Sequence, residues 1–164
     1  MSILLALLLA FAPTVKAPTG GTPEERAFKP PTASVPDKET ARAEAAFDGG
    51  KAELAIEECK RALAVNERHV PAMVVLAKAY YQLKKLELAS AILDGAAVID
   101  PRNADVAIVR GFILLAGEDQ PGAIAQFKLA TELDKGHAAA WNNLGAQYLG
   151  TKSYDGARNA LESA

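Results

Sequence analysis

The chain has few of the residues that carry chemistry in most enzymes and metalloproteins. It holds one cysteine among 164 residues, which excludes an intrachain disulfide and a cysteine-based metal site. Its formal net charge is -2, with no cluster of lysine and arginine, so we expect no nucleic-acid partner. Aromatic residues make up 6% and hydrophobic residues 50%, so aliphatic side chains must supply most of the core.

Long hydrophobic runs are also missing, apart from one near the start. Residues 3–12 are continuously apolar, which is too short for a bilayer core that needs about 20 residues. The run has the length of a signal-peptide hydrophobic region, although no lysine or arginine precedes it and no cysteine follows it. We interpret residues 1–17 as a signal segment and expect an exported, periplasmic or envelope-associated protein that meets the membrane only through this segment. The alternative is an uncleaved anchor or a misassigned start, and without a signal the protein would be cytoplasmic.

Residues 18–36 are predicted to form a disordered linker. Six prolines lie between residues 13 and 36, with Gly20-Gly21 among them. Proline removes a backbone donor and blocks a helix interior, and a segment of this composition cannot bury a core. We therefore expect the folded part to begin near Asp37.

What the chain does contain is a repeat of 34 residues. Small residues recur at this period in three columns, and large residues such as Leu76 and Leu93 lie between them. A fixed period of roughly 20–50 residues indicates a stacked-repeat architecture. Within each period, two helical patterns are separated by a turn. The columns are Ala55, Ala89, Ala123 and Ala157; Ala62, Ala96, Ala130 and Ala164; and Ala43, Ala77, Gly111 and Gly145.

The repeat divides residues 37–164 into four helix pairs, in units 36–69, 70–103, 104–137 and 138–164, the last incomplete. The small columns give paired helices the clearance to approach closely. We therefore predict an all-α solenoid of stacked antiparallel helices. Because Ala164 falls inside the last predicted helix, we expect the natural chain to continue. The predicted helices span residues 40–47 and 53–65, 72–83 and 87–99, 105–116 and 122–133, and 138–149 and 155–164.

These motifs resemble the tetratricopeptide repeat family. The resemblance implies a right-handed superhelix whose first helices line a concave groove that binds a protein or peptide partner. The chain departs from the family pattern at Arg42 and Arg110, and Glu67 and Lys135 stand where Pro101 does. The residues that carry the resemblance are Trp141, Asn142, Asn143, Leu144, Gly145, Tyr148, Tyr154 and Ala157, with Asp100-Pro101 as a terminator.

On the groove side of the first helices, side chains at spacings of four and three share one face. In the second and third units this face is apolar apart from Lys78, which favours a binding strip. We expect the Phe112 ring to face the open surface near Tyr81 and Leu115. The alternative is that Phe112 and Leu115 pack between neighbouring helices. The predicted peptide-binding residues are Val74, Lys78, Tyr81, Ile108, Phe112, Leu115 and Asn142.

No catalytic residue, metal site or cofactor is predicted. His69 and His137 end their units 68 residues apart, so they cannot share a metal ion or act on one nucleophile. Cys59 shares a column with Leu93, which indicates a small buried hydrophobe. No glycine-rich phosphate loop or His-Glu-x-x-His motif is present.

The sequence therefore predicts a non-enzymatic scaffold or assembly factor, whose oligomeric state it leaves open. Signal segment, linker and repeats together resemble accessory proteins of pilus or gliding-motility machines. A chaperone adaptor is disfavoured, because Thr40 and Glu44 hold the places of the family's carboxylate-clamping residues. The alternative is a docking arm of a larger enzyme whose catalytic domain follows residue 164.

Overall fold

The computed structural model describes residues 35–164. The predicted signal segment and residues 18–34 of the predicted linker lie outside this range. Within it the chain forms eight α-helices and no strand, and none of these helices has the length and apolar character to cross a membrane. The helices are α1 (Val35–Asp48), α2 (Ala52–Val65), α3 (Val70–Gln82), α4 (Leu86–Ile99), α5 (Ala104–Ala116), α6 (Gln120–Leu133), α7 (Ala138–Gly150) and α8 (Tyr154–Glu162).

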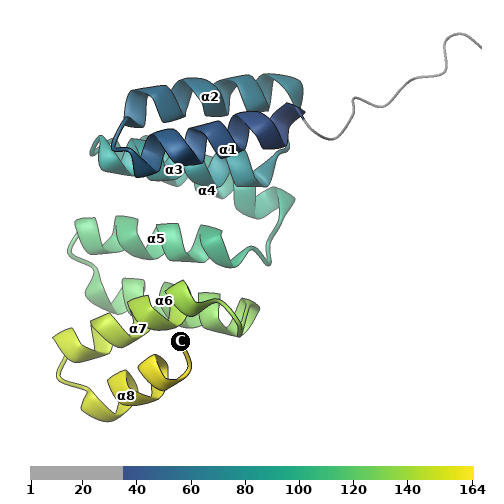
Figure 1. Ribbon diagram of the computed structural model, residues 1–164. Helices are drawn as coiled ribbons and strands as arrows, with labels where there is room; N and C mark the ends of the chain where they lie inside the picture. Colours follow the sequence, from purple (N-terminus) through teal and green to yellow (C-terminus); the bar gives the residue numbers. More distant parts are fainter. Residues whose placement is uncertain (1–34) are drawn as a thin grey trace, which may run out of the picture. The chain divides into compact units, whose positions relative to one another are not determined.

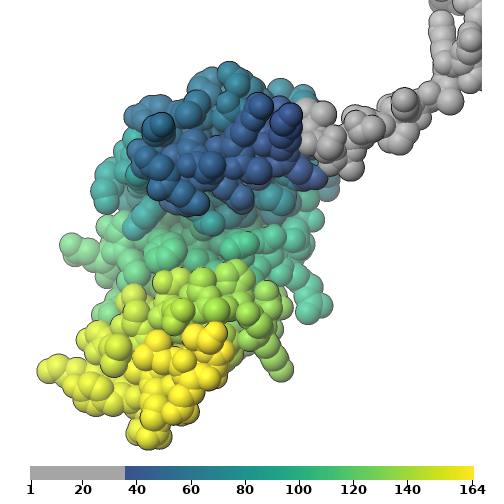
Figure 2. All heavy atoms as spheres, in the orientation of Figure 1, coloured from purple at the N-terminus to yellow at the C-terminus, as the bar shows by residue number. Residues whose placement is uncertain are grey.

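The helices form four hairpins that stack in chain order, from the blue α1–α2 pair to the yellow α7–α8 pair (Figures 1 and 2). Each second helix also contacts the first helix of the next hairpin. The first helices of the first three hairpins, α1, α3 and α5, contact one another in succession. This arrangement is an all-α solenoid, as the 34-residue period predicted.

Helix α1 begins earlier than predicted, at Val35, inside the range interpreted as linker. Pro36 is tolerated there because the first turn of a helix needs no amide donor. The Thr40 hydroxyl donates a hydrogen bond to the Pro36 carbonyl at 2.6 Å. The other seven helices begin and end within two residues of the predicted bounds.

The small-residue columns lie at the contacts between helices. Ala55, Ala89 and Ala123 are fully buried and Ala157 is 2% exposed. A Cβ atom at Gly145 would come within 2.8 Å of Leu161 Cγ, so glycine is needed at this position for the two helices to pack as they do. The prediction was wrong for one residue of the columns, Ala164. Helix α8 ends at Glu162, so Ala164 lies exposed beyond the helix.

The turn inside each hairpin contains one residue with a left-handed backbone, again at intervals of 34 residues. Only the first of these is glycine, Gly50 at φ 72°. Lys84, Glu118 and Lys152 adopt φ between 60° and 63°, a conformation that costs a side chain-bearing residue free energy. The amide of the following residue bonds back to the helix, as Lys85 N does to the Tyr80 carbonyl at 2.9 Å. This is the Schellman type of helix end.

The turns between hairpins depend on an Asx side chain rather than on proline. Asn66 Oδ1 accepts a hydrogen bond from Arg68 N at 3.1 Å, and Asp134 Oδ1 accepts one from Gly136 N at 3.0 Å. Asp100 makes the same contact to Arg102 N at 3.2 Å. Such a bond closes an Asx turn. The departures from the family pattern at the Pro101 position therefore leave the turn intact.

Candidate functional site

Two of the predicted peptide-binding residues are buried, which corrects the sequence prediction. Val74 is 4% exposed and packs in a cluster with Val106 and Val109. Ile108 is 5% exposed and packs in a cluster with Leu144. The physical reason is that successive hairpins stack closely, so these positions face a neighbouring helix. Neither side chain is available to a partner.

Four other predicted residues lie half-buried on α3 and α5: Lys78, Tyr81, Phe112 and Leu115. The rings of Tyr81 and Phe112 meet across the boundary between hairpins, with centroids 6.2 Å apart and planes inclined by 36°. Lys84 Nζ lies 5.8 Å from the centroid of the Tyr81 ring, which is cation–π geometry. We call these residues, with Lys84 included, the aromatic face. Sequence reasoning missed Lys84 because it belongs to a turn.

Phe112 is shared between this face and the core. Its ring also meets Phe127 edge-on, with centroids 5.5 Å apart and an interplanar angle of 68°. Phe127 is fully buried. The expected contact with Tyr81 is therefore present, but the ring also supports the interior. The alternative drawn from the sequence, packing between helices, thus holds for part of this side chain.

The two outer units differ from the middle of the solenoid. Thr40 is 5% exposed, so the first unit presents Glu44, an exposed side chain, and a half-buried Phe47. In the last unit Asn142 is exposed, unlike Val74 and Ile108, and Leu149 is 49% exposed. Asn142 does not join the aromatic face, because it belongs to α7.

Cys59 is fully buried, as the sequence predicted. Burial raises the pKa of its thiol from 9.0 to about 12, and the carboxylates of Glu44 and Glu58 act in the same direction. A thiol with this pKa is protonated at neutral pH, and the thiolate is the nucleophilic form. Cys59 is therefore an inert core residue.

The two histidines occupy equivalent places, each just before a first helix. His137 Nε2 lies 3.2 Å from Asp105 Oδ1, and His69 Nε2 lies 3.5 Å from Asp37 Oδ1. Each pair joins two neighbouring hairpins. Among residues 35–164, no group of three histidine, cysteine or carboxylate side chains is placed to hold a metal ion.

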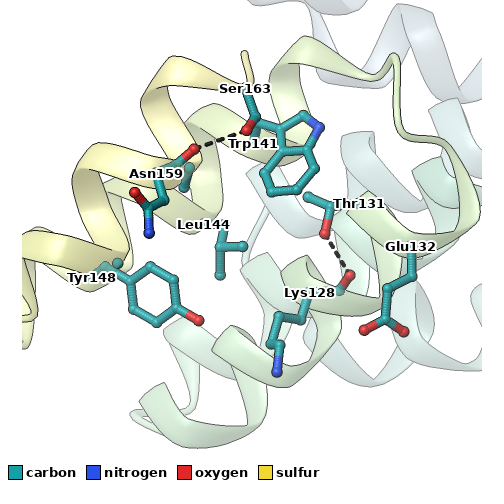
Figure 3. A pocket seen from close by; sticks show the side chains of 10 residues that line it. Lys128, Thr131, Glu132, Trp141, Leu144, Tyr148, Asn159 and Ser163 are labelled. Carbon is teal, nitrogen blue, oxygen red and sulfur yellow. Dashed lines mark hydrogen bonds between the residues drawn. The ribbon is translucent and has the colours of Figure 1, made fainter.

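A pocket of about 390 Å³ lies between α6, α7 and α8 (Figure 3). Sequence reasoning did not identify it. Its apolar wall comes from the Trp141 ring, Leu144 and Tyr148, which share one side of α7. Polar side chains of α6 and α8 surround this wall. The complete lining is Lys128, Thr131, Glu132, Trp141, Leu144, Tyr148, Gly156, Asn159, Ala160 and Ser163.

Comparison with known proteins agrees with the fold. Residues 46–111 match a family model described as tetratricopeptide repeat. Among curated protein sequences, none matches the chain significantly. The structure of TTC0263, a thermophilic TPR protein of Thermus thermophilus, is 25% identical, with a TM-score of 0.72 over 81% of this chain and 76% of that one.

Two further solved structures share the fold at lower identity. The first TPR of Spaghetti (RPAP3), bound to the HSP90 peptide SRMEEVD, is 19% identical, with a TM-score of 0.60 over 72% of this chain and 94% of that one. Pseudomonas aeruginosa pilF is 21% identical, with a TM-score of 0.64 over 79% of this chain and 60% of that one. The family match and the fold support the resemblance to tetratricopeptide repeat proteins, and the described chain is a solenoid of this type.

Proposed function

We propose that this chain is a scaffold that binds a protein partner on the aromatic face. The observation that carries the proposal is the contact between Tyr81 and Phe112, two half-buried rings from neighbouring hairpins. Aromatic anchors near the centre of an interface carry most of its binding energy in many complexes. Stacked helical repeats present extended surfaces of this kind to partners. The TPR of RPAP3, whose structure holds a bound peptide, is a precedent for the fold.

The partner segment that fits this face is a peptide or helix with an apolar side chain. That side chain would lie on Tyr81, Phe112 and Leu115, which together cross two hairpins. Lys78 and Lys84 border the rings and would contact polar or acidic groups of the partner. Because the rings are already held by core contacts, binding would need little reordering of the scaffold.

Site-specific photo-crosslinking tests the location of this surface. A photoreactive phenylalanine analogue replaces Lys78 or Leu115 in the full chain, which is then expressed in the organism that encodes it. The matched controls carry the analogue at Lys60 and Ala125, which are exposed on the second helices α2 and α6. We expect the same crosslinked partner from Lys78 and Leu115 and none from the controls. A partner captured only from Lys60 or Ala125 would contradict the proposal.

We also propose that the protein is exported and acts in assembly at the cell envelope. The support is the apolar run at residues 3–12 and the proline-rich segment that follows it. Fusing residues 1–36 to alkaline phosphatase lacking its own signal tests this, because that enzyme is active only after export. We expect activity from the fusion and its loss when Leu5 and Leu8 are both changed to aspartate. Equal activity in both fusions would reject export through this run.

A further inference from the structure

We propose that the pocket between α6, α7 and α8 is a second binding site, for a partner peptide in which a leucine-type side chain lies beside an aspartate or glutamate. The site is independent of the aromatic face. Trp141, Leu144 and Tyr148 line the pocket from one side of α7, whereas the residues equivalent to the aromatic face, Asn142 and Leu149, lie on another. The occupant follows from comparing this pocket with the same place one repeat earlier.

One repeat earlier, the same place holds a smaller pocket of about 120 Å³, lined in part by Arg110, Leu114 and Gln126. Arg110 of α5 corresponds to Leu144, and Asp94 of α4 corresponds to Lys128. Arg110 Nη2 lies 2.6 Å from Asp94 Oδ1, so an ion pair joins α4 and α5 at this place. In the last repeat both partners are replaced. Among the described residues, Lys128 forms no ion pair.

At one position of the lining, α8 carries a smaller side chain than α4 and α6 do. Ala160 of α8 corresponds to Gln126 of α6 and to Ile92 of α4, which are both half-buried. Gly156 also lines the pocket, and the equivalent residue of α6, Gly122, is a glycine too. A volume of about 390 Å³ lies in the range of small-ligand sites, roughly 300–1,000 Å³, and admits one large side chain.

The apolar wall of the pocket is held in position by the fold. Leu144 is 3% exposed, so its side chain is held by the core and forms the base of the pocket. The Trp141 indole N–H donates to the Lys135 carbonyl at 2.9 Å, which orients the ring. The Thr131 and Ser163 hydroxyls donate to the carbonyls of Lys128 and Asn159, as the dashed lines in Figure 3 show. These hydroxyls are satisfied, so an apolar side chain can enter without breaking a hydrogen bond.

Two side chains of opposite charge on α6 line the pocket, Lys128 and Glu132, and the preceding repeat indicates that Lys128 is the one directed towards α7. Asp94, at the position of Lys128, reaches the neighbouring first helix, which shows that this position faces that helix. Val98, at the position of Glu132, is 82% exposed, which shows that this position faces solvent. The pocket therefore favours a carboxylate beside the apolar group, in place of the missing internal ion pair.

Trp141, the one tryptophan of the chain, reports directly on occupancy through its fluorescence. The probes are the blocked dipeptides acetyl-Asp-Leu-amide and acetyl-Leu-Asp-amide, titrated into the full chain. The controls are acetyl-Asn-Leu-amide, which lacks the charge, and acetyl-Asp-Ala-amide, which lacks the apolar side chain. We expect a saturable change with a Kd on the order of millimolar for at least one probe. Affinity should fall about two- to fivefold without the charge and about tenfold or more without the leucine.

Variants that copy the preceding repeat test the pocket itself. Ala160→Gln should abolish the fluorescence change without lowering Tm, because the same framework already holds Gln126. Ala125→Gln, on the exposed side of α6, should bind the probe as the parent does. Lys128→Gln removes only the charge and should reduce Asp-Leu binding to the level of Asn-Leu. If Ala160→Gln lowers Tm, Lys128→Gln still tests the pocket. Lys128 is exposed, so its replacement should leave folding unchanged.

Three results would overturn the proposal. Unchanged probe binding by Ala160→Gln would place the probe elsewhere. A dimer that Ala160→Gln dissociates in sedimentation would make a second copy the occupant. Stronger probe binding after Leu5→Asp and Leu8→Asp are combined in the full chain would make the chain's own apolar run the occupant.

Discussion

Gly111 of α5 lies directly against the ring of Phe127 in α6. A Cβ atom at Gly111 would come within 2.6 Å of Phe127 Cε1, a distance that side chains do not adopt. The ring is fully buried, so it has no free space into which it can move. This contact sets how closely the two helices of the third hairpin approach.

Gly111→Ala should therefore destabilise the protein, although alanine favours helices. Overpacking costs about 1–3 kcal/mol, against about 0.5–1 kcal/mol gained in helix propensity. Gly95→Ala is the matched control, because Gly95 lies within α4 and its nearest neighbour, Met73 Cε, is 3.6 Å away. We expect the control to be neutral or stabilised. Urea denaturation measures both, and a Gly111→Ala protein as stable as the parent would contradict this packing.

The left-handed turn residues give a prediction of the opposite sign. Glu118→Gly should raise the free energy of unfolding by about 0.5–1 kcal/mol, because glycine adopts φ 63° without strain. Lys84→Gly should gain less, since it also removes the cation–π contact with Tyr81, about 0.5 kcal/mol at an exposed site. Gly50→Ala, at φ 72°, should lose stability. The ranking of the three midpoints in denaturant checks the prediction, and the same loss from all three changes would reject it.

Phe112→Ala should lower stability by roughly 2 kcal/mol, less than the roughly 3–5 kcal/mol of a fully buried phenylalanine. The ring loses contacts with both Tyr81 and Phe127. The sequence alone placed this ring on the open surface, where its removal would leave the melting midpoint nearly unchanged. The Phe127 contact is the reason for the revision. Phe112→Leu keeps apolar volume and should cost less than half as much. A melting midpoint that is unchanged in Phe112→Ala would show that the Phe127 contact contributes nothing.

Cys59 should resist alkylation at neutral pH and lose its stabilising contribution in alkali. Its folded pKa is raised to about 12 from 9.0, so the folded protein holds the thiol proton more tightly than the unfolded chain does. The contribution is fully present below about pH 9 and falls as the pH rises towards about 12.

The difference in stability between the parent and Cys59→Ala isolates this contribution from the titration of lysine and tyrosine. That difference should shrink from about pH 9 upwards. Iodoacetamide labelling at about neutral pH should proceed only through unfolding. Rapid labelling of the folded protein would contradict the burial of this side chain.

The sequence by itself determined the repeat, the helices and the helix contacts. Ala55, Ala89 and Ala123 recur at a fixed spacing because two helices approach closely at each of these positions, where only a small side chain fits. The same close approach buries them, so the pattern predicts burial directly. The predicted bounds fail chiefly at Val35, where a proline-containing segment continues as helix. Proline at a first turn is compatible with a helix, and composition cannot separate that case from a linker.

The tertiary structure decided which residues of one helix face are open. Val74 and Lys78 share a face of α3 by spacing, yet only Lys78 remains partly exposed. Periodicity defines the side of a helix on which a residue lies, but burial depends on which neighbouring helix covers that side. The pocket beside Leu144 has the same origin. It is lined by residues of α6, α7 and α8, so it is a property of three packed helices rather than of any one segment.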